Sequence, residues 1–141
     1  MNQNKTILIA ELGGTNARLA ITEDGKSLKN RYETKLEDSK SAEQLFRGYC
    51  SQIVGIPIRR AIIGVAAPML GEEVKLTNSN LEFNKKKLET LFSKQLLILN
   101  DLELQAHAIE ALEQKEIRRI GNVTESKKGS KILVSPGTGL G

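Results

Sequence analysis

The chain has 141 residues and a mass of 15.5 kDa, which is the size of one ordinary domain. Hydrophobic residues make up 39% and charged residues 27%, so the composition excludes disorder, collagen and coiled coil. The net charge of +4 is small and Trp is absent, which argues against a stacking surface for nucleic acid. No apolar run approaches the roughly 20 residues of a membrane helix. The first residues do not have the pattern of a secretory signal, and a single cysteine, Cys50, fits a reducing compartment. We therefore expect a soluble cytoplasmic protein.

The first third of the chain is predicted to form strands. Residues 6–10 are an apolar run and residues 17–21 alternate between polar and apolar types. Gly13-Gly14 lies between them and favours a turn, so the two segments form a hairpin, and residues 29–34 can add a third strand. Apolar residues at helical spacing then predict a helix over residues 40–54, with Cys50 on its buried face rather than acting as a nucleophile.

The rest of the chain alternates between strands and helices. Apolar runs predict central strands at residues 61–67 and 96–99, a short strand at 74–76 and a last strand at 131–134. Asn84 is a plausible N-cap for a helix through Phe92. Asn100-Asp101 begin a further helix whose apolar positions extend to Leu112. A hairpin meander followed by alternating helices and strands indicates an α/β fold with a mixed sheet.

The turn after the first predicted strand is a candidate phosphate site. Glycine lets the backbone approach a ligand closely, and the N–H groups of Gly13, Gly14 and Thr15, with the Thr15 hydroxyl, could cradle phosphate oxygens. Glu11, just before the turn, could hold a hydrated Mg²⁺. The alternative is a plain hairpin turn, and the turn by itself does not decide between the two.

Two further segments are candidates for chemistry. Asn100-Asp101 follow a buried strand, where open α/β sheets place their ligands. Asp101 could accept a proton from a substrate hydroxyl in phosphoryl transfer, or it could only cap the helix. The terminal run 137–141 (GTGLG) suits backbone contact with phosphate, although its spacing is not that of a dinucleotide-binding fingerprint.

Four segments in the same order resemble the motifs of the bacterial-type glucokinases, members of the actin-like, sugar-kinase and Hsp70 ATPase superfamily. Residues 11–20 (ELGGTNARLA) are similar to the first phosphate motif of that family, and residues 66–78 to its sugar-side segment. Residues 100–106 (NDLELQA) are similar to the catalytic segment and residues 136–141 (PGTGLG) to the second phosphate motif. The fold that this resemblance implies is a ribonuclease-H-like mixed sheet with flanking helices, the small lobe of an actin-like ATPase.

The resemblance implies ATP-dependent phosphorylation of the 6-hydroxyl of glucose, with Mg²⁺ as the cofactor. Asp101 would be the general base, Asn100 a sugar ligand with Asn78 or Asn80 nearby, and Glu11 a water-mediated metal ligand where the family normally has Asp. The residues that would face the phosphates of ATP are Gly13, Gly14, Thr15, Asn16, Thr138 and Gly139.

Family members are more than twice as long, so the resemblance implies that residues 1–112 are the small lobe and residues 113–141 only the first part of a larger lobe. We accordingly expect the isolated chain to be inactive and, with apolar surface exposed, to form a dimer or a larger species. The rival hypothesis is a non-catalytic sugar-binding or interaction module. A regulator of the same superfamily is less favoured, because no helix-turn-helix pattern is present.

Overall fold

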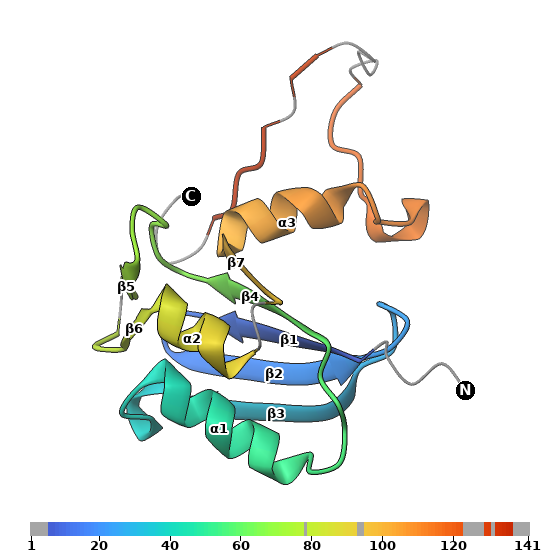
Figure 1. The fold of residues 1–141 in the computed structure, drawn as a ribbon. Helices are drawn as coiled ribbons and strands as arrows, with labels where there is room; N and C mark the ends of the chain where they lie inside the picture. Colours follow the sequence, from blue (N-terminus) through green and yellow to red (C-terminus); the bar gives the residue numbers. More distant parts are fainter. Residues whose placement is uncertain (1–5, 78, 93–94, 123–128, 131, 137–141) are drawn as a thin grey trace. The chain divides into compact units, whose positions relative to one another are not determined.

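The computed structural model describes residues 6–77, 79–92, 95–122, 129–130 and 132–136 (Figure 1). The chain divides into two compact units, Met1–Asp101 and Leu102–Gly141. The first unit holds all the strands of the described residues, and the second holds most of one helix and the irregular segments that follow it.

The first unit is built on a five-stranded sheet with the order β3-β2-β1-β4-β7. Its strands are β1 (Ile7–Leu12), β2 (Asn16–Thr22), β3 (Lys29–Lys35), β4 (Arg60–Val65) and β7 (Leu96–Asn100). β1, β2 and β3 form an antiparallel meander, whereas β1, β4 and β7 run parallel. The predicted mixed sheet and its hairpin are therefore confirmed.

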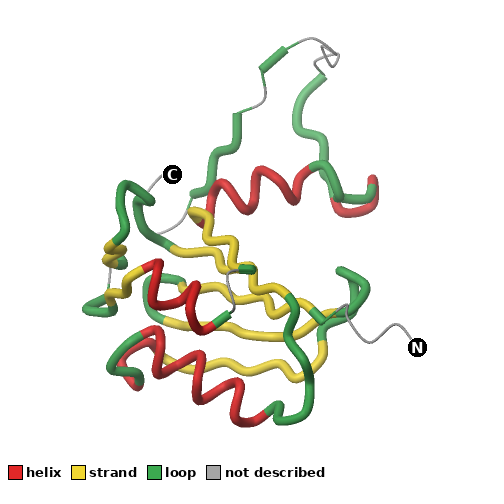
Figure 2. The backbone as a smooth tube through the Cα atoms, viewed as in Figure 1, coloured by secondary structure: helices red, strands yellow, loops and turns green. Residues whose placement is uncertain are grey.

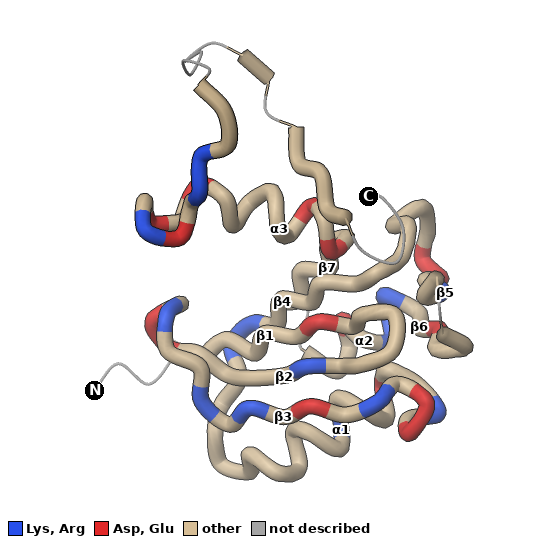
Figure 3. Tube along the Cα trace, turned by 180° about the vertical axis from the view of Figure 1, so that it is seen from behind, with Lys and Arg blue, Asp and Glu red and all other residues tan. Residues whose placement is uncertain are grey.

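Two helices, α1 (Ala42–Gln52) and α2 (Lys85–Leu91), cover one face of this sheet (Figures 1 and 2). Ser41 and Asn84 cap them, because their side chains accept the N–H groups of Gln44 and Lys87. Alternate residues of the strands point to the helices, among them Leu8, Leu12, Leu19 and Ile63. They form the core together with the helix residues Phe46, Tyr49 and Leu88. The opposite face of the sheet carries the remaining residues of each strand, and no helix of the first unit covers it (Figure 3).

A small ribbon extends from the carboxyl end of β4. Its strands are β5 (Glu73–Lys75), which was predicted, and β6 (Glu82–Asn84), which was not. β6 leads directly into α2, and the N–H of Lys85 donates to the carbonyl of Glu72 over 2.9 Å. Val74, Leu76 and Phe83 of this segment are buried in the core, so the ribbon is part of the main packing.

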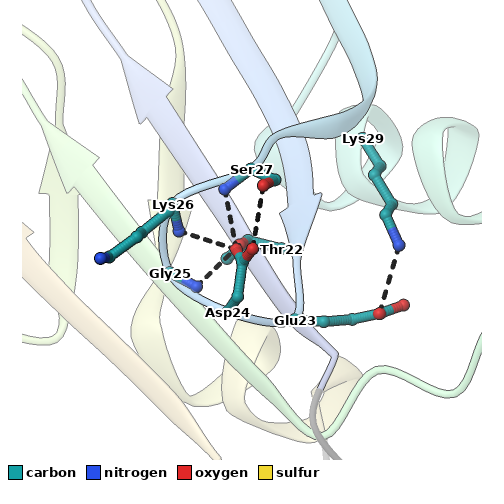
Figure 4. Close-up of polar contacts among 7 residues, drawn as sticks. All are labelled: Thr22, Glu23, Asp24, Gly25, Lys26, Ser27 and Lys29. Atoms are coloured by element: carbon teal, nitrogen blue, oxygen red, sulfur yellow. Dashed lines mark hydrogen bonds and ion pairs between the residues drawn. The ribbon is translucent and has the colours of Figure 1, made fainter.

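The turn between β2 and β3 is organised around Asp24 (Figure 4). One carboxylate oxygen of Asp24 accepts the N–H groups of Lys26 and Ser27 over 2.8 and 2.7 Å, and the other accepts the Ser27 hydroxyl over 2.9 Å. Gly25 has a φ of 73°, a backbone conformation that glycine adopts readily and other residues rarely. These bonds stabilise the charged form, so the pKa of Asp24 lies well below its usual value.

The second unit begins within α3 (Asp101–Ile109) and contains the short 3₁₀ helix η2 (Gln114–Glu116). α3 ends before the predicted Leu112, because the N–H groups of Ala111 and Leu112 donate to Ala108 and Ile109 and tighten its last turn. The strand predicted at 131–134 is wrong over the described residues 132–134, which form no strand. A strand needs a neighbour to bond, and the described residues of this unit include none. No helix in the described part of the chain is long and apolar enough to cross a membrane.

Candidate functional site at the carboxyl edge of the sheet

The parallel strands β1, β4 and β7 place their carboxyl ends at one edge of the sheet, where α/β proteins bind ligands. The segments that leave these strands are joined to one another by hydrogen bonds. The N–H of Ala66, after β4, donates to the carbonyl of Leu12 at the end of β1 over 2.9 Å. The side-chain Nδ2 of Asn100, at the end of β7, donates to the carbonyl of Ala67 over 3.1 Å. Three of the four motif segments therefore meet at this edge.

The sugar-side segment is fixed at the same place. Thr77 donates both its N–H, over 3.2 Å, and its hydroxyl Oγ1, over 3.1 Å, to the carbonyl of Ala66. These two hydrogen bonds to one acceptor hold the chain that follows β5 against the chain that follows β4. Of the residues predicted to contact the sugar, Asn80 lies two residues after this segment and is exposed. Asn78 lies outside the described residues.

The glycine turn joins β1 to β2 and leaves part of its backbone available to a ligand. The N–H of Gly13 donates to the carbonyl of Asn16 over 3.0 Å, and a Cβ at Gly13 would lie 3.3 Å from that oxygen. The carbonyl of Thr15 accepts the N–H of Leu36 over 2.8 Å, which ties the turn to the 3₁₀ helix η1 (Leu36–Asp38). Within the described residues, the N–H groups of Gly14 and Thr15 have no protein acceptor. Such donors suit phosphate oxygens.

Glu11, the last polar residue before this turn, is paired with a cation. Arg18 lies opposite Glu11 in the β1–β2 register and opposite Glu33 in the β2–β3 register. Its Nη1 donates to Oε2 of Glu11 and its Nε to Oε1 of Glu33, each over 3.1 Å. The hydrogen bond that Arg18 donates to Glu11 and the charge of Glu33 raise the pKa of Arg18 above its ordinary value. Figure 3 shows the acidic, basic and acidic positions side by side on β1, β2 and β3.

Asp101 follows Asn100 directly and is the first residue of α3. The residue is partly buried and makes at least one polar or electrostatic interaction. The backbone thus carries Asp101 to the edge at which the glycine turn, Ala66 and Thr77 meet, as its place in the sequence predicted. The other predicted phosphate residues, Thr138 and Gly139, lie outside the described residues.

Among the described residues of this edge, Glu11 could take part in holding a metal ion. The described residues contain no group of three or more His, Cys, Asp or Glu side chains that could hold a metal ion. Glu11 offers a carboxylate that is about half exposed, with a side-chain exposure of 48%. Mg²⁺ prefers oxygen ligands and commonly keeps several of its waters, so one or two carboxylates and substrate phosphates suffice.

Sequence reasoning gave no role to Arg18, Thr77 or Glu33. Arg18 and Thr77 lie inside motif segments, so their positions at the edge follow from the motifs, but their partners do not. Glu33 lies on β3, outside every motif. Its pairing depends on the register between β2 and β3, which includes an irregularity between Leu19 and Ile21. No signal in the sequence specifies that register.

Comparison with known proteins decides the family. The family profile described as Glucokinase matches residues 8–141 of the chain. This chain belongs to the glucokinase family. A glucokinase of Chelativorans sp. (strain BNC1) is 34% identical over 137 residues, which are 96% of this chain and 40% of that protein. A glucokinase of Neisseria meningitidis serogroup C / serotype 2a is 30% identical over 135 residues, covering 95% of this chain and 41% of that protein. The chain thus spans about 40% of the length of the curated glucokinases it matches.

Solved glucokinases share the fold. The crystal structure of a glucokinase from an Antarctic psychrotroph matches 79% of the chain and 37% of that protein, with a TM-score of 0.69 and 30% identity. The glucokinase of Balamuthia mandrillaris, solved in complex with glucose, matches 74% of the chain and 32% of that protein, with a TM-score of 0.57 and 22% identity. The expected mixed α/β fold of this family is therefore confirmed.

Proposed function

We propose that this chain is the part of an ATP-dependent glucokinase that supplies the catalytic base and one phosphate-binding turn for phosphorylation of the 6-hydroxyl of glucose. One observation carries the proposal furthest. Hydrogen bonds join Leu12 to Ala66, Ala66 to Thr77 and Ala67 to Asn100, so the glycine turn and Asp101 belong to one edge of one sheet. Phosphoryl transfer to an alcohol needs a phosphate cradle and a proton acceptor held close together.

In the proposed reaction, each residue of the edge has a defined task. The N–H groups of Gly14 and Thr15 and the Thr15 hydroxyl would bind phosphate oxygens of ATP, as the backbone of phosphate loops does. Asp101 would accept the proton of the 6-hydroxyl as that oxygen attacks the γ-phosphorus and the bond to the departing ADP breaks. Asn100 would orient the sugar. The proposal extends to Asn78 and Asn80 as neighbouring sugar ligands, and to Gly13, Asn16, Thr138 and Gly139 at the phosphates.

Glu11 would hold Mg²⁺ through water. A bound magnesium ion would neutralise the charge that develops on the transferred phosphoryl group and on the leaving phosphate. The residue types support this assignment. Among the described residues Arg18 binds only Oε2 of the half-exposed Glu11 carboxylate, and oxygen ligands beside a phosphate site match the preference of Mg²⁺.

The division of the chain is also part of the proposal. We propose residues 1–112 as the small lobe and residues 113–141 as the beginning of a larger one. The proposed use of ATP, together with one free cysteine and no disulfide, supports a cytoplasmic location.

Self-association of the isolated chain is also part of the proposal. It is supported by large apolar side chains of the second unit that are exposed: Leu112, Ile117, Ile120, Ile132 and Val134. Light scattering at tens of micromolar tests this, and a clean monomer would contradict it.

Asp101→Asn in the protein expressed from the full reading frame tests the proposed chemistry. Asn has nearly the same shape as Asp and suits the start of a helix, so the melting temperature should stay nearly unchanged. Loss of the proton acceptor should lower kcat by about 10²–10⁴-fold, measured by a coupled assay for glucose 6-phosphate. Near-normal turnover at an unchanged melting temperature would show that Asp101 only begins the helix. The 141-residue chain alone should bind Mg-ATP or glucose weakly and show no turnover above background.

A further inference from the structure

The ion pairs of Arg18 extend the candidate site across two strands, to a residue that no motif contains. Glu11, Arg18 and Glu33 lie in register on β1, β2 and β3. They stand on the sheet face opposite the helices, because Ala17 and Leu19, the neighbours of Arg18, belong to the core. Two nitrogens of the Arg18 side chain, Nη1 and Nε, are each 3.1 Å from a carboxylate oxygen. The guanidinium therefore bridges the acid beside the glycine turn and the acid on the outer strand.

The shape of the guanidinium couples its two partners. Its nitrogens lie in one rigid plane with fixed donor directions. A carboxylate that holds Nε thus also fixes the direction in which Nη1 donates. Without Glu33, the Arg18 side chain would be tied at Nη1 alone and would regain rotational freedom. Among the described residues, Arg18 is the only hydrogen-bond or ion-pair partner of the Glu11 carboxylate. A more mobile Arg18 would therefore make the Glu11 side chain more mobile as well.

We propose that Glu33 is a positioning residue of the phosphate site: by holding Arg18 it fixes the Glu11 carboxylate beside the glycine turn. This inference rests on the proposed function for the role of Glu11. The ion-pair ladder itself, formed by Glu11, Arg18 and Glu33, does not depend on that function. Glu33 is not a catalytic residue, since it acts only through Arg18. All three side chains are about half exposed, with values of 48% for Glu11, 58% for Arg18 and 56% for Glu33. Solvent therefore screens the effect, and it should be modest.

The chain offers a matched control. Glu37 follows β3, is exposed, and pairs with a single cation, Lys35, over 3.3 Å. Glu33→Ala and Glu37→Ala each remove one negative charge from the same region, but only the first releases Arg18. Glu33→Gln keeps an oxygen that can accept from Nε and removes the charge, so its effect should be smaller than that of Glu33→Ala.

The first measurement is the mobility of Glu11 in the 141-residue chain, from ¹³C relaxation of side-chain-labelled glutamate. Glu33→Ala should increase the mobility of the Glu11 side chain, and Glu37→Ala should not. In an Arg18→Gln background, Glu33→Ala should have no further effect, because the connection is already broken. Unchanged mobility of Glu11 in Glu33→Ala would overturn the inference, whatever the protein does with ATP.

The second measurement is the dissociation constant for Mg-ATP, by calorimetry, in the same variants. Glu33→Ala should weaken binding about two- to fivefold, since an exposed pair is worth up to about 1 kcal/mol and 1.4 kcal/mol is tenfold. The loss should disappear in the Arg18→Gln background. An equal loss in Glu37→Ala would show a general charge effect and overturn the positioning role. More mobile Glu11 with unchanged affinity would also overturn it.

The two measurements separate this inference from the proposed function. If the wild-type chain and the protein from the full reading frame bind no Mg-ATP while Glu33→Ala still mobilises Glu11, the proposed function fails and the ladder stands as a structural coupling. If both bind Mg-ATP and Glu11 is unaffected by Glu33→Ala, the proposed function stands and the inference fails. Raising the salt concentration to about 1 M should reduce the effect of Glu33→Ala on affinity, because the screening length falls to about 3 Å.

Discussion

The side-chain amide of Asn100 donates to the backbone carbonyl of Ala67 over 3.1 Å, and this bond joins the ends of two parallel strands that are far apart in the sequence. β4 and β7 are already paired in register up to Val65 and Asn100. The side chain continues that connection past the end of the ladder. It therefore holds the chain that leads into Asp101 against the chain that follows β4.

Replacing Asn100 by Asp should destabilise the fold. The carbonyl of Ala67 would lose its donor and face a carboxylate instead, and an unsatisfied, partly buried acceptor costs about 1–3 kcal/mol. Asn80→Asp is the matched control, because Asn80 is exposed; a surface substitution of this kind stays within about 0.5 kcal/mol. Urea unfolding of both variants measures the difference. Equal stability of the two would mean that the bond to Ala67 contributes nothing.

Asp24 should make the stability of the chain depend on pH in the acid range. The N–H groups of Ser27 and Lys26 hold its pKa below the usual value, so its contribution is complete above the unfolded pKa of about 3.9. The contribution is lost as the pH falls through the lower pKa of the folded state. Asp24→Asn should thus be less stable than the wild type at pH 7, and the difference should shrink below about pH 3.9.

Thermal unfolding from pH 7 to pH 2.5 tests this expectation. Glu23→Gln serves as the control, because Glu23 is a neighbouring acid that, among the described residues, makes only an exposed ion pair with Lys29. A stability difference between Asp24→Asn and the wild type that stays constant over the whole range would contradict the role given to the ionised carboxylate in Figure 4.

Phe46 should be the most sensitive position of α1. It is fully buried, and its ring meets that of Phe92 edge-on, with the ring centroids 5.4 Å apart. Phe46→Ala should lower the free energy of unfolding by about 3–5 kcal/mol, the usual cost of removing a buried aromatic side chain. Val54→Ala, at a side chain that is 82% exposed, should change it by less than about 0.5 kcal/mol. Denaturant unfolding compares the two. A cost below about 1 kcal/mol for Phe46→Ala would show that the core refills the space.

Most of the sheet and both core helices could be predicted because their patterns are strong and local. The alternation over residues 17–21, the apolar run at 61–67 and the capping residue Asn84 each correspond to an element of the structure. β6 was missed because Glu82–Asn84 has a single apolar residue and ends on Asn84, which signals the start of α2, whereas the alternation at residues 74–76 pointed to β5. The segment at 131–134 has strand composition, but a strand also requires a neighbour, and composition cannot supply that information.

The candidate site could be predicted in part for a similar reason. Glu11, Asn100 and Asp101 are placed by strand ends, and strand ends follow from the sequence. The bonds of Thr77 to Ala66 and of Arg18 to Glu33 depend on the path of a loop and on strand register. Register is set by the packing of the whole sheet and by its irregularity after Leu19, so single-sequence patterns do not determine it.

The strand order has a consequence for the way the chain folds. β1, β2 and β3 pair through short connections, whereas β1 meets β4 only after the whole of α1 has been added between them. Hairpins form within about 1–10 μs, while pairing of distant segments is slower because a long loop must close first. We therefore expect the glycine turn to form before β4 and β7 complete the carboxyl edge of the sheet. Pulse-labelled hydrogen exchange would show early protection in β1 and β2 and late protection in β4 and β7; simultaneous protection would contradict this. The carboxyl edge is then the last part of the sheet to be completed, so a growing chain acquires its ligand-binding geometry only when the fold itself is finished.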